Sequence, residues 1–187
     1  WYSFVSLSEE GSKIELSPVR ESSTQGDQEI ASIMDAIGVQ SEFENSLVTL
    51  TSKGESQREI SIDFRNCPDL AQTVLVSAAV KGVSLKMTGL ESLKIKETDR
   101  ITAMQNELAK IGAKLEEHRN SWSLTPTTHL PKEVEIETYE DHRMAMAFAP
   151  LSQVMEVIIQ DPIVVEKSYP KFWKDVEQVG IQVEQVS

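Results

Sequence analysis

Apolar residues recur with a helical period in three separate segments of the chain. In the middle segment they follow the spacing i, i+3, i+7, i+10, which is one face of an amphipathic helix: Ile101, Met104, Leu108 and Ile111. Each segment ends in an apolar residue followed by a glycine, a common way to end a helix. These glycines are Gly38, Gly112 and Gly180, which stand 74 and then 68 residues apart. Such an internal period predicts repeated structural units.

Helices of a second type are expected before the amphipathic ones. Residues 70–80 and 143–154 are apolar nearly all round, which predicts buried helices, and Trp1–Ser8 fits the end of another. A strand is predicted after each of them: 13–16, 83–87 and 157–160. The amphipathic helices are expected to begin at 26–27, 97–98 and 169–170, with strands after them at 39–43, 113–115 and 181–183.

Further strands are expected to pair 47–51 with 60–64 and 122–124 with 134–137. Each unit then has the order strand, helix, strand, helix, strand, strand. The predicted fold class is α/β (α+β), with three such units that pack their apolar helices inside and their sheets outside. No low-complexity linker interrupts the sequence, so we expect residues 1–187 to form one domain.

Composition narrows the classes of function. The net charge of −12 argues against nucleic acid as a partner, because binding of phosphate backbones depends on Lys and Arg. No apolar run approaches the ~20 residues that span a bilayer, so no membrane partner is expected. The first residues lack a basic region and an initiating Met, which predicts a fragment or trimmed product without a signal peptide. A single cysteine, Cys67, excludes an intrachain disulfide and fits a reducing cytoplasm.

Neither a metal nor a cofactor is expected. The three histidines, His118, His129 and His142, are scattered, and the sequence has no HExxH or CxxC spacing. It also lacks GxGxxG and GxxxxGK[ST], so dinucleotide binding and P-loop chemistry have no support.

Charged residues gather just before predicted helices. The stretches are Asp69 after Cys67-Pro68, Lys96-Glu97, Asp141-His142-Arg143, and Lys167. Pseudo-symmetric units would bring these helix starts to one end of the domain. The expected pocket contains the cations Lys96, Arg100, Arg143 and Lys167 with the acids Asp69 and Glu97. Such cations suit a phosphate ester, and the carboxylates suit general acid and base roles.

Simpler interpretations of the same residues remain open. Asp69 and Asp141 fit ordinary helix N-caps, and Glu97 and Asp99 fit acids that favour the first turn of a helix. Arg100 fits a surface ion pair with either of the latter two. Lys167 alone fits a solvated lysine. Two further interpretations are structural: Met144 and Met146 as core residues, and Cys67 as a small core residue rather than a nucleophile.

Several blocks together resemble the EPSP synthase family, the 3-phosphoshikimate 1-carboxyvinyltransferases. The two most specific are Lys96-Glu97-Thr98-Asp99-Arg100 and residues 139–147, Tyr-Glu-Asp-His-Arg-Met-Ala-Met-Ala. The others, in the family's order and spacing, are residues 66–69, 25–27, 161–162 and 167–170. The resemblance covers essentially the whole chain.

The resemblance implies transfer of the enolpyruvyl group of phosphoenolpyruvate to the 5-hydroxyl of shikimate 3-phosphate, with release of phosphate and without metal or organic cofactor. It implies that Asp69 accepts the hydroxyl proton and that Glu97 protonates the methylene carbon. The implied ligands are Lys96 for the shikimate phosphate, and Arg100, Arg143 and Lys167 for phosphoenolpyruvate. Asp141, His142 and Ser92 complete the expected substrate-binding set, Ser92 standing where the family commonly has Asn.

The resemblance also implies a second domain. The family places its active site between two domains built on the same repeat and works as a monomer. The chain is expected to be the C-terminal domain, partnered by an N-terminal domain and catalytically incomplete alone. Two alternatives remain open at this point: an enolpyruvyl transferase acting on UDP-N-acetylglucosamine, and a non-catalytic repeat domain that binds anions or serves as structure.

Overall fold

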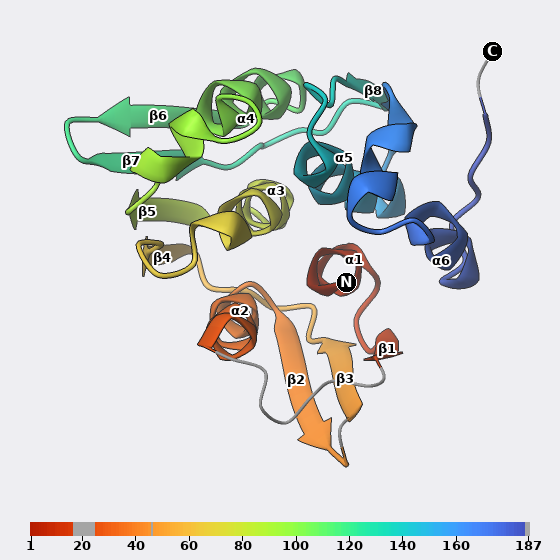
Figure 1. The fold of residues 1–187 in the computed structure, drawn as a ribbon. Helices are drawn as coiled ribbons and strands as arrows, with labels where there is room; N and C mark the ends of the chain where they lie inside the picture. The colour runs from red at the N-terminus through yellow and green to blue at the C-terminus, as the bar shows by residue number, and fades with distance from the viewer. Residues whose placement is uncertain (17–24, 46, 186–187) are drawn as a thin grey trace.

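Three helices lie side by side at the centre of the fold, and three sheets surround them (Figure 1). The computed structural model describes residues 1–16, 25–45 and 47–185, with the backbone alone at 25–28. The central helices are α1 (Tyr2–Leu7), α3 (Ala71–Lys81) and α5 (His142–Phe148). Helix α1 packs on α3, and α3 packs on α5. Among the described residues, no helix is long and apolar enough to cross a membrane.

The middle unit has all six expected elements. They are β4 (Glu59–Asp63), α3, β5 (Ser84–Thr88), α4 (Arg100–Lys110), β6 (Lys114–His118) and β7 (Ser121–Thr125). Short 3-10 helices, η1 (Pro68–Leu70) and η2 (Glu91–Ile95), precede α3 and α4. The four strands form one sheet in the order β4-β5-β7-β6, in which only the β4–β5 pair is parallel.

The flanking units repeat parts of this pattern. The first contains α1, β1 (Lys13–Leu16), α2 (Gln25–Ala36), β2 (Val39–Glu44) and β3 (Leu47–Ser52). Its sheet order, β1-β3-β2, matches β5-β7-β6 of the middle unit. The third contains β8 (Glu133–Ile136), α5, η3 (Ala149–Gln153), β9 (Glu156–Ile159), η4 (Pro162–Lys167) and α6 (Phe172–Gln178). Its parallel pair β8–β9 matches β4–β5, so the predicted repeat is confirmed.

Burial follows the predicted division between inner helices and outer sheets. Val74, Leu75 and Val76 on consecutive positions of α3 are all fully buried, because neighbouring elements cover every side of this helix. In β3 the burial alternates residue by residue, as expected for a strand with one face on the core. The core is therefore formed by α1, α3 and α5 with the inner faces of the sheets.

Two predicted strand pairings are wrong, although the strands exist. Strand β3 pairs with β1 and β2, and β4 pairs with β5 instead of β3. Likewise β7 pairs with β5 and β6, and β8 pairs with β9. The boundary between successive units falls between β3 and β4 and between β7 and β8, so neighbours along the chain belong to different sheets.

Helices α4 and α6 begin two to three residues later than predicted, and two other segments differ more. The apolar segment 143–154 is helix α5 followed by the 3-10 helix η3, because Pro150 has no N–H to continue an α-helical ladder. Residues 181–185 form no strand. The equivalent strand of the middle unit, β6, pairs with β7, and the described part of the third unit contains no counterpart of β7.

The repeated helix-end glycines have left-handed backbones, which supports the predicted helix ends. Gly38 has φ +103° and Gly180 has φ +91°. A Cβ atom at residue 38 would lie 2.5 Å from the carbonyl oxygen of Glu55, whereas a Cβ at residue 180 would meet no atom within 4 Å. The same repeat position is therefore crowded in one unit and open in another.

We expect Gly38→Ala to destabilise the fold more than Gly180→Ala. Both substitutions force alanine into a left-handed conformation, at about 1–2 kcal/mol. Only the first adds a collision with backbone, because of the 2.5 Å approach to Glu55. Urea unfolding of both variants measures the difference, and equal losses of unfolding free energy would contradict the crowded environment of residue 38.

Candidate functional site

Three junctions between a loop and a helix meet at one point of the domain. They bring together Asp69 from η1, Glu97 from the segment between η2 and α4, Arg100 from the first turn of α4, and Asp141 from the start of α5. These residues are up to 72 positions apart in sequence, from 69 to 141. The expected convergence of charged residues at helix starts is therefore what the structure has.

Arg100 joins the junctions through its guanidinium group. Nε donates to Oδ2 of Asp141 at 2.6 Å, and Nη2 donates to Oδ1 of the same residue at 3.3 Å. Nη1 donates to Oδ1 of Asp69 at 3.1 Å, and Nη2 also donates to Oε2 of Glu97 at 2.6 Å. The Arg100 side chain is only 1% exposed and that of Asp141 is 0% exposed. The surface ion pair considered for Arg100 is therefore wrong: its charge is buried and bound to three carboxylates.

Asp69 receives further cations from the more open side of the cluster. Nη2 of Arg143 lies 3.1 Å from Oδ2 of Asp69, and Nη1 of Arg143 donates to the backbone carbonyl of Asp69 at 3.2 Å. Nζ of Lys96 lies 3.7 Å from Oδ1. Arg143 and Asp69 are 37% and 40% exposed, so this part of the cluster is accessible to a ligand.

The helix-cap interpretation applies to some of these acids but not to others. Asp141 caps α5, since its Oδ1 accepts from the backbone N–H of Arg143 at 2.8 Å, and it also binds Arg100. Asp99 caps α4 by accepting from the N–H of Thr102 at 3.0 Å. Asp69 lies inside η1, and none of its hydrogen bonds caps that helix. Its side chain instead accepts from arginines.

The remaining predicted residues lie around the cluster. Lys167, in η4, donates from Nζ to the backbone carbonyl of Glu140 at 3.2 Å, so it is tied to the segment before Asp141. Nδ1 of His142 lies 3.9 Å from Oδ1 of Asp141, which is contact without a hydrogen bond. Ser92 is exposed on η2, which packs against η1.

The segment before Asp141 has an unusual backbone. Tyr139 and Glu140 have φ values of +54° and +57°, and the N–H of Asp141 donates to the carbonyl of Thr138 at 2.9 Å. This is a β-turn with two consecutive left-handed residues, neither of them glycine. Such residues cost on the order of 1–3 kcal/mol each and persist only where the surroundings hold them.

One residue that sequence reasoning did not single out supports this turn. Glu107 of α4 is buried and accepts from the hydroxyl of Tyr139 at 2.9 Å and from the N–H of Glu137 at 3.1 Å. The sequence does carry a signal that Glu107 lies near the core, because it is seven positions after Arg100 and next to the apolar face of α4. Burial raises the pKa of the Tyr139 phenol, and the hydrogen bond to Glu107 acts in the same direction, so the phenol stays a donor.

The chemistry available at the cluster is that of an anion site with built-in acids and bases. Three cations contact the carboxylates of Asp69, Glu97 and Asp141: Lys96, Arg100 and Arg143. A fourth, Lys167, binds the backbone carbonyl of Glu140 next to Asp141. Arginine suits bidentate binding of phosphate or carboxylate. Asp69 and Glu97 are the two exposed acids, so these two are placed to exchange protons with a ligand.

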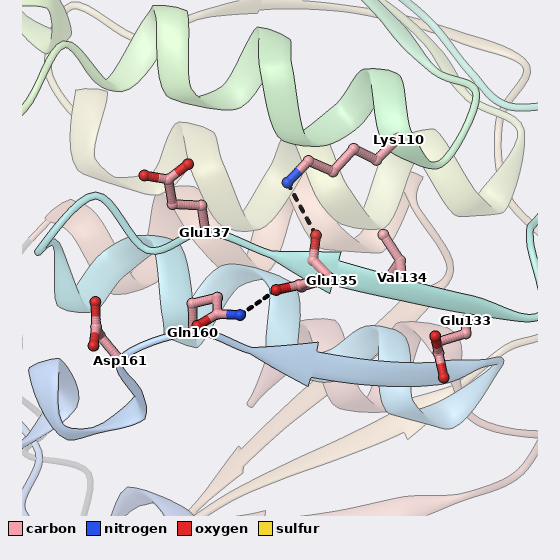
Figure 2. Close-up of a pocket in the computed structure, with 7 residues that line it drawn as sticks. All are labelled: Lys110, Glu133, Val134, Glu135, Glu137, Gln160 and Asp161. Atoms are coloured by element: carbon pink, nitrogen blue, oxygen red, sulfur yellow. Dashed lines mark hydrogen bonds between the residues drawn. The ribbon is translucent and has the colours of Figure 1, made fainter. Parts of the chain in front are cut away.

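Other parts of the surface fit this chemistry less well. The hollow drawn in Figure 2 shares no residue with the cluster and is lined by four acids with Lys110, Val134 and Gln160. Its acidic lining does not suit an anionic ligand. Cys67 is buried in the core, and burial raises the pKa of its thiol, which fits a packing role. Within the described ranges, no group of three or more His, Cys, Asp or Glu side chains could hold a metal ion.

Comparison with known proteins agrees with the fold and the repeat. A solved EPSP synthase from Acinetobacter baumannii superposes with a TM-score of 0.76 at 22% identity, covering 98% of this chain and 45% of that one. A second structure of an EPSP synthase from the same organism gives 0.72 at 21% identity, over 100% and 46%. The fold is thus that of the EPSP synthases, and the middle unit of this chain has the full βαβαββ order.

Comparison of the sequence with known families and proteins identifies the family of this chain. The model of the EPSP synthase (3-phosphoshikimate 1-carboxyvinyltransferase) family matches residues 3–176, so the chain belongs to the EPSP synthase family. A 3-phosphoshikimate 1-carboxyvinyltransferase of Bacteroides fragilis (strain YCH46) is 40% identical over 98% of this chain and 45% of its own length. One from Clostridium novyi (strain NT) is 37% identical over 91% and 39%. The chain therefore spans less than half the length of these curated relatives.

We expect Arg100→Met to cost about 3–5 kcal/mol of unfolding free energy, because it leaves the buried carboxylate of Asp141 without its cation. Adding Asp141→Asn should recover part of the loss, since asparagine still caps α5 but carries no charge. Chemical denaturation measures both.

The matched control is Arg65→Met. Arg65 also binds an aspartate, Asp63, but its side chain is 77% exposed. Its removal should leave the unfolding free energy unchanged within error. A loss at Arg100 as small as that at Arg65 would contradict the buried hub.

Proposed function

We propose that the protein transfers the enolpyruvyl group of phosphoenolpyruvate to the 5-hydroxyl of shikimate 3-phosphate, releasing phosphate, without metal or organic cofactor. The chain supplies the C-terminal half of the active site. The observation that carries the proposal is the convergence of Asp69, Glu97 and Arg143 around Arg100. All four residues fall in the blocks that resemble the EPSP synthase family.

Asp69 and Glu97 have the proposed proton-transfer roles. Asp69 takes the proton of the attacking hydroxyl, while Glu97 gives a proton to the methylene carbon of phosphoenolpyruvate as the new C–O bond forms. Loss of phosphate from the tetrahedral intermediate and return of one methyl proton to the Glu97 carboxylate then form the enol ether of the product. The geometry supports this division, because one guanidinium binds both carboxylates, Asp69 at Nη1 and Glu97 at Nη2. Both acids are thereby held beside the same guanidinium group, one at each terminal nitrogen.

The cations stabilise the substrate charges. Arg143 is the most accessible arginine of the cluster, and its present partner is Asp69 at 3.1 Å. A phosphate or carboxylate arriving at Arg143 replaces that partner, which leaves Oδ2 of Asp69 open to accept a proton while Oδ1 stays bound to Arg100. Lys96, at 3.7 Å from Asp69, is proposed to bind the shikimate phosphate, and Lys167 to bind phosphoenolpyruvate. Fixed cations of this kind stabilise charge in the transition state.

Arg100 is less available to a substrate than the other cations of the cluster. Its N–H groups already bind three carboxylates, and its side chain is buried. Direct contact with phosphoenolpyruvate requires an exchange of Glu97 or Asp69, which lie on the accessible side. Asp141 stays in place as the buried partner. His142, next to Asp141, and Ser92, on η2, are proposed to complete the substrate contacts.

The proposed partner of this domain is an N-terminal domain that completes both substrate sites and closes over them. Closure excludes water and assembles the full set of catalytic groups. We infer a monomeric protein acting in the cytoplasm, consistent with its single buried free cysteine. Sedimentation of the full-length polypeptide as a dimer would contradict the monomer.

The shikimate reaction is favoured over the reaction with UDP-N-acetylglucosamine. The family model and the relatives described above are named for 3-phosphoshikimate. An assay that exchanges one acceptor for the other distinguishes the two. For the isolated chain, a non-catalytic anion-binding domain remains the competing outcome of the experiments below.

The decisive substitutions are Glu97→Gln and Asp69→Asn in a full-length polypeptide that carries this chain. Each removes a proposed proton-transfer group while keeping its shape, so kcat should fall by about 100-fold or more. Release of phosphate from phosphoenolpyruvate and shikimate 3-phosphate is the measurement. Glu91→Gln is the matched control: Glu91 is an exposed acid at the start of η2, and its loss should leave kcat unchanged. Unchanged kcat in the first two variants would mean that these acids take no part in catalysis, and it would favour the non-catalytic interpretation of this domain.

A mixing experiment tests the proposal that this chain supplies only half of the active site. The chain alone should release no phosphate, and addition of the separately prepared N-terminal half should restore the reaction. Turnover by the chain alone at an enzyme-like rate would overturn it. If both halves are folded and associated yet inactive together, the anion-binding interpretation gains the support instead.

A further inference from the structure

We propose that Glu107 is a positioning residue for the cluster. Together with Tyr139 it holds the left-handed turn 138–141, and this turn presents Asp141 to Arg100 and the carbonyl of Glu140 to Lys167. The consequence for turnover rests on the proposed function. The consequence for the geometry around Arg100 does not.

Glu107 is a buried carboxylate that accepts hydrogen bonds from two residues of the segment 137–139. Oε1 accepts from the hydroxyl of Tyr139 at 2.9 Å, and Oε2 accepts from the backbone N–H of Glu137 at 3.1 Å. Asn106 adds a hydrogen bond from Nδ2 to the same hydroxyl at 3.3 Å. The Glu107 side chain is 1% exposed, so protein contacts and not solvent stabilise its charge, and two of those contacts come from the segment that enters the turn.

The charge of Glu107 is balanced by Lys110, which also donates a hydrogen bond to the neighbouring strand β8. Nζ of Lys110 lies 2.6 Å from Oε2 of Glu107 and donates to the backbone carbonyl of Glu135 at 3.0 Å. Figure 2 shows Lys110 reaching from α4 to Glu135 on β8. One side of α4 is thereby fixed to the end of β8, immediately before the turn.

Helix α4 holds the segment 137–141 at two points. Arg100 and Glu107 are seven residues apart, which is close to two helical turns, so they share one face. Each is 1% exposed. Arg100 binds the far end of the segment at Asp141, and Glu107 binds the near end at Glu137 and Tyr139. Two buried charges of opposite sign therefore fix the path of the backbone between them.

The turn needs such support because its backbone is unfavourable. Tyr139 and Glu140 both have positive φ, a conformation that side-chain-bearing residues leave when nothing holds them. If Glu107 released Tyr139, the turn could relax, and both Asp141 and the carbonyl that binds Lys167 would shift. A displacement of about 1 Å in a catalytic site is enough to lower a rate substantially.

The test uses Tyr139→Phe and Glu107→Gln in a full-length polypeptide that carries this chain. Tyr139→Phe keeps the ring and removes only the hydroxyl, so it remains informative if Glu107→Gln folds poorly. The control is Tyr2→Phe, which removes a hydroxyl that accepts from Ser41 at 3.0 Å in the first unit. The three variants are compared by thermal unfolding, by kcat and KM, and by the Nε–H signal of Arg100 after selective ¹⁵N-arginine labelling.

The proposal predicts two changes that a merely structural role does not produce. In Tyr139→Phe, kcat falls about tenfold with little change in KM, while the melting temperature falls no more than in Tyr2→Phe. In the same variant the Arg100 Nε–H exchanges with solvent about tenfold faster, because its bond to Asp141 loosens. Glu107→Gln shifts both readouts further, because its amide places a donor against existing donors.

Failure of the proposed reaction and failure of the positioning role would give different results. An inactive wild-type protein whose Arg100 signal responds to both substitutions would reject the proposed reaction but support the positioning role. An active protein in which Tyr139→Phe changes neither the Arg100 signal nor kcat would overturn the positioning role. A fall in kcat matched by Tyr2→Phe would also overturn it, because the effect would then follow from stability alone.

Discussion

Burial of the Arg100 guanidinium beside the Asp141 carboxylate constrains everything at this end of the domain. Removing two charges from water is expensive, and the cost is offset only when geometry and additional hydrogen bonds satisfy both partners. Here Asp141 also caps α5, and Arg100 also binds Asp69 and Glu97. Helices α4 and α5, with η1, must therefore meet at one fixed distance and angle. The positions of the exposed acids follow from that buried pair.

The repeated units explain how residues distant in sequence come to share this point. The middle unit places two loop-to-helix junctions at this point and the third unit places one, and the three central helices pack side by side. Loops carried on such a framework vary in chemistry without changing the fold. Asp69, Arg100 and Asp141 thus belong to different helices, yet one guanidinium reaches all of the junctions. The fold brings the junctions close together, and Arg100 fixes their positions relative to one another.

The sequence predicts the repeat, the helix types and most strands, because apolar periodicity and helix-end glycines are local signals. Pairing of β3 with β4 was wrong because a strand's partner depends on where one unit ends, and local spacing does not carry that information. Convergence of Asp69, Glu97 and Arg143 followed from the symmetry argument. The burial of Arg100 and the contacts of Glu107 did not, because whether a helix buries a charge depends on partners some 30 to 40 residues away. Positive φ at Tyr139 and Glu140 had no sequence signal either, since neither is Gly or Asn.

A buried ion pair is weak evidence for stability, since well-packed apolar residues of similar volume often stabilise a fold as well or better. The presence of Arg100 and Asp141 is therefore better explained by geometry than by free energy. An apolar pair in their place could fill the volume but could not space Asp69 from Glu97, which Arg100 does by binding one at each terminal nitrogen. The same reasoning applies to Glu107, whose charge is as deeply buried and whose contacts lead to the turn before Asp141. The domain accepts the cost of two buried charges on one face of α4, and what those charges hold in place is the arrangement of the open carboxylates and cations.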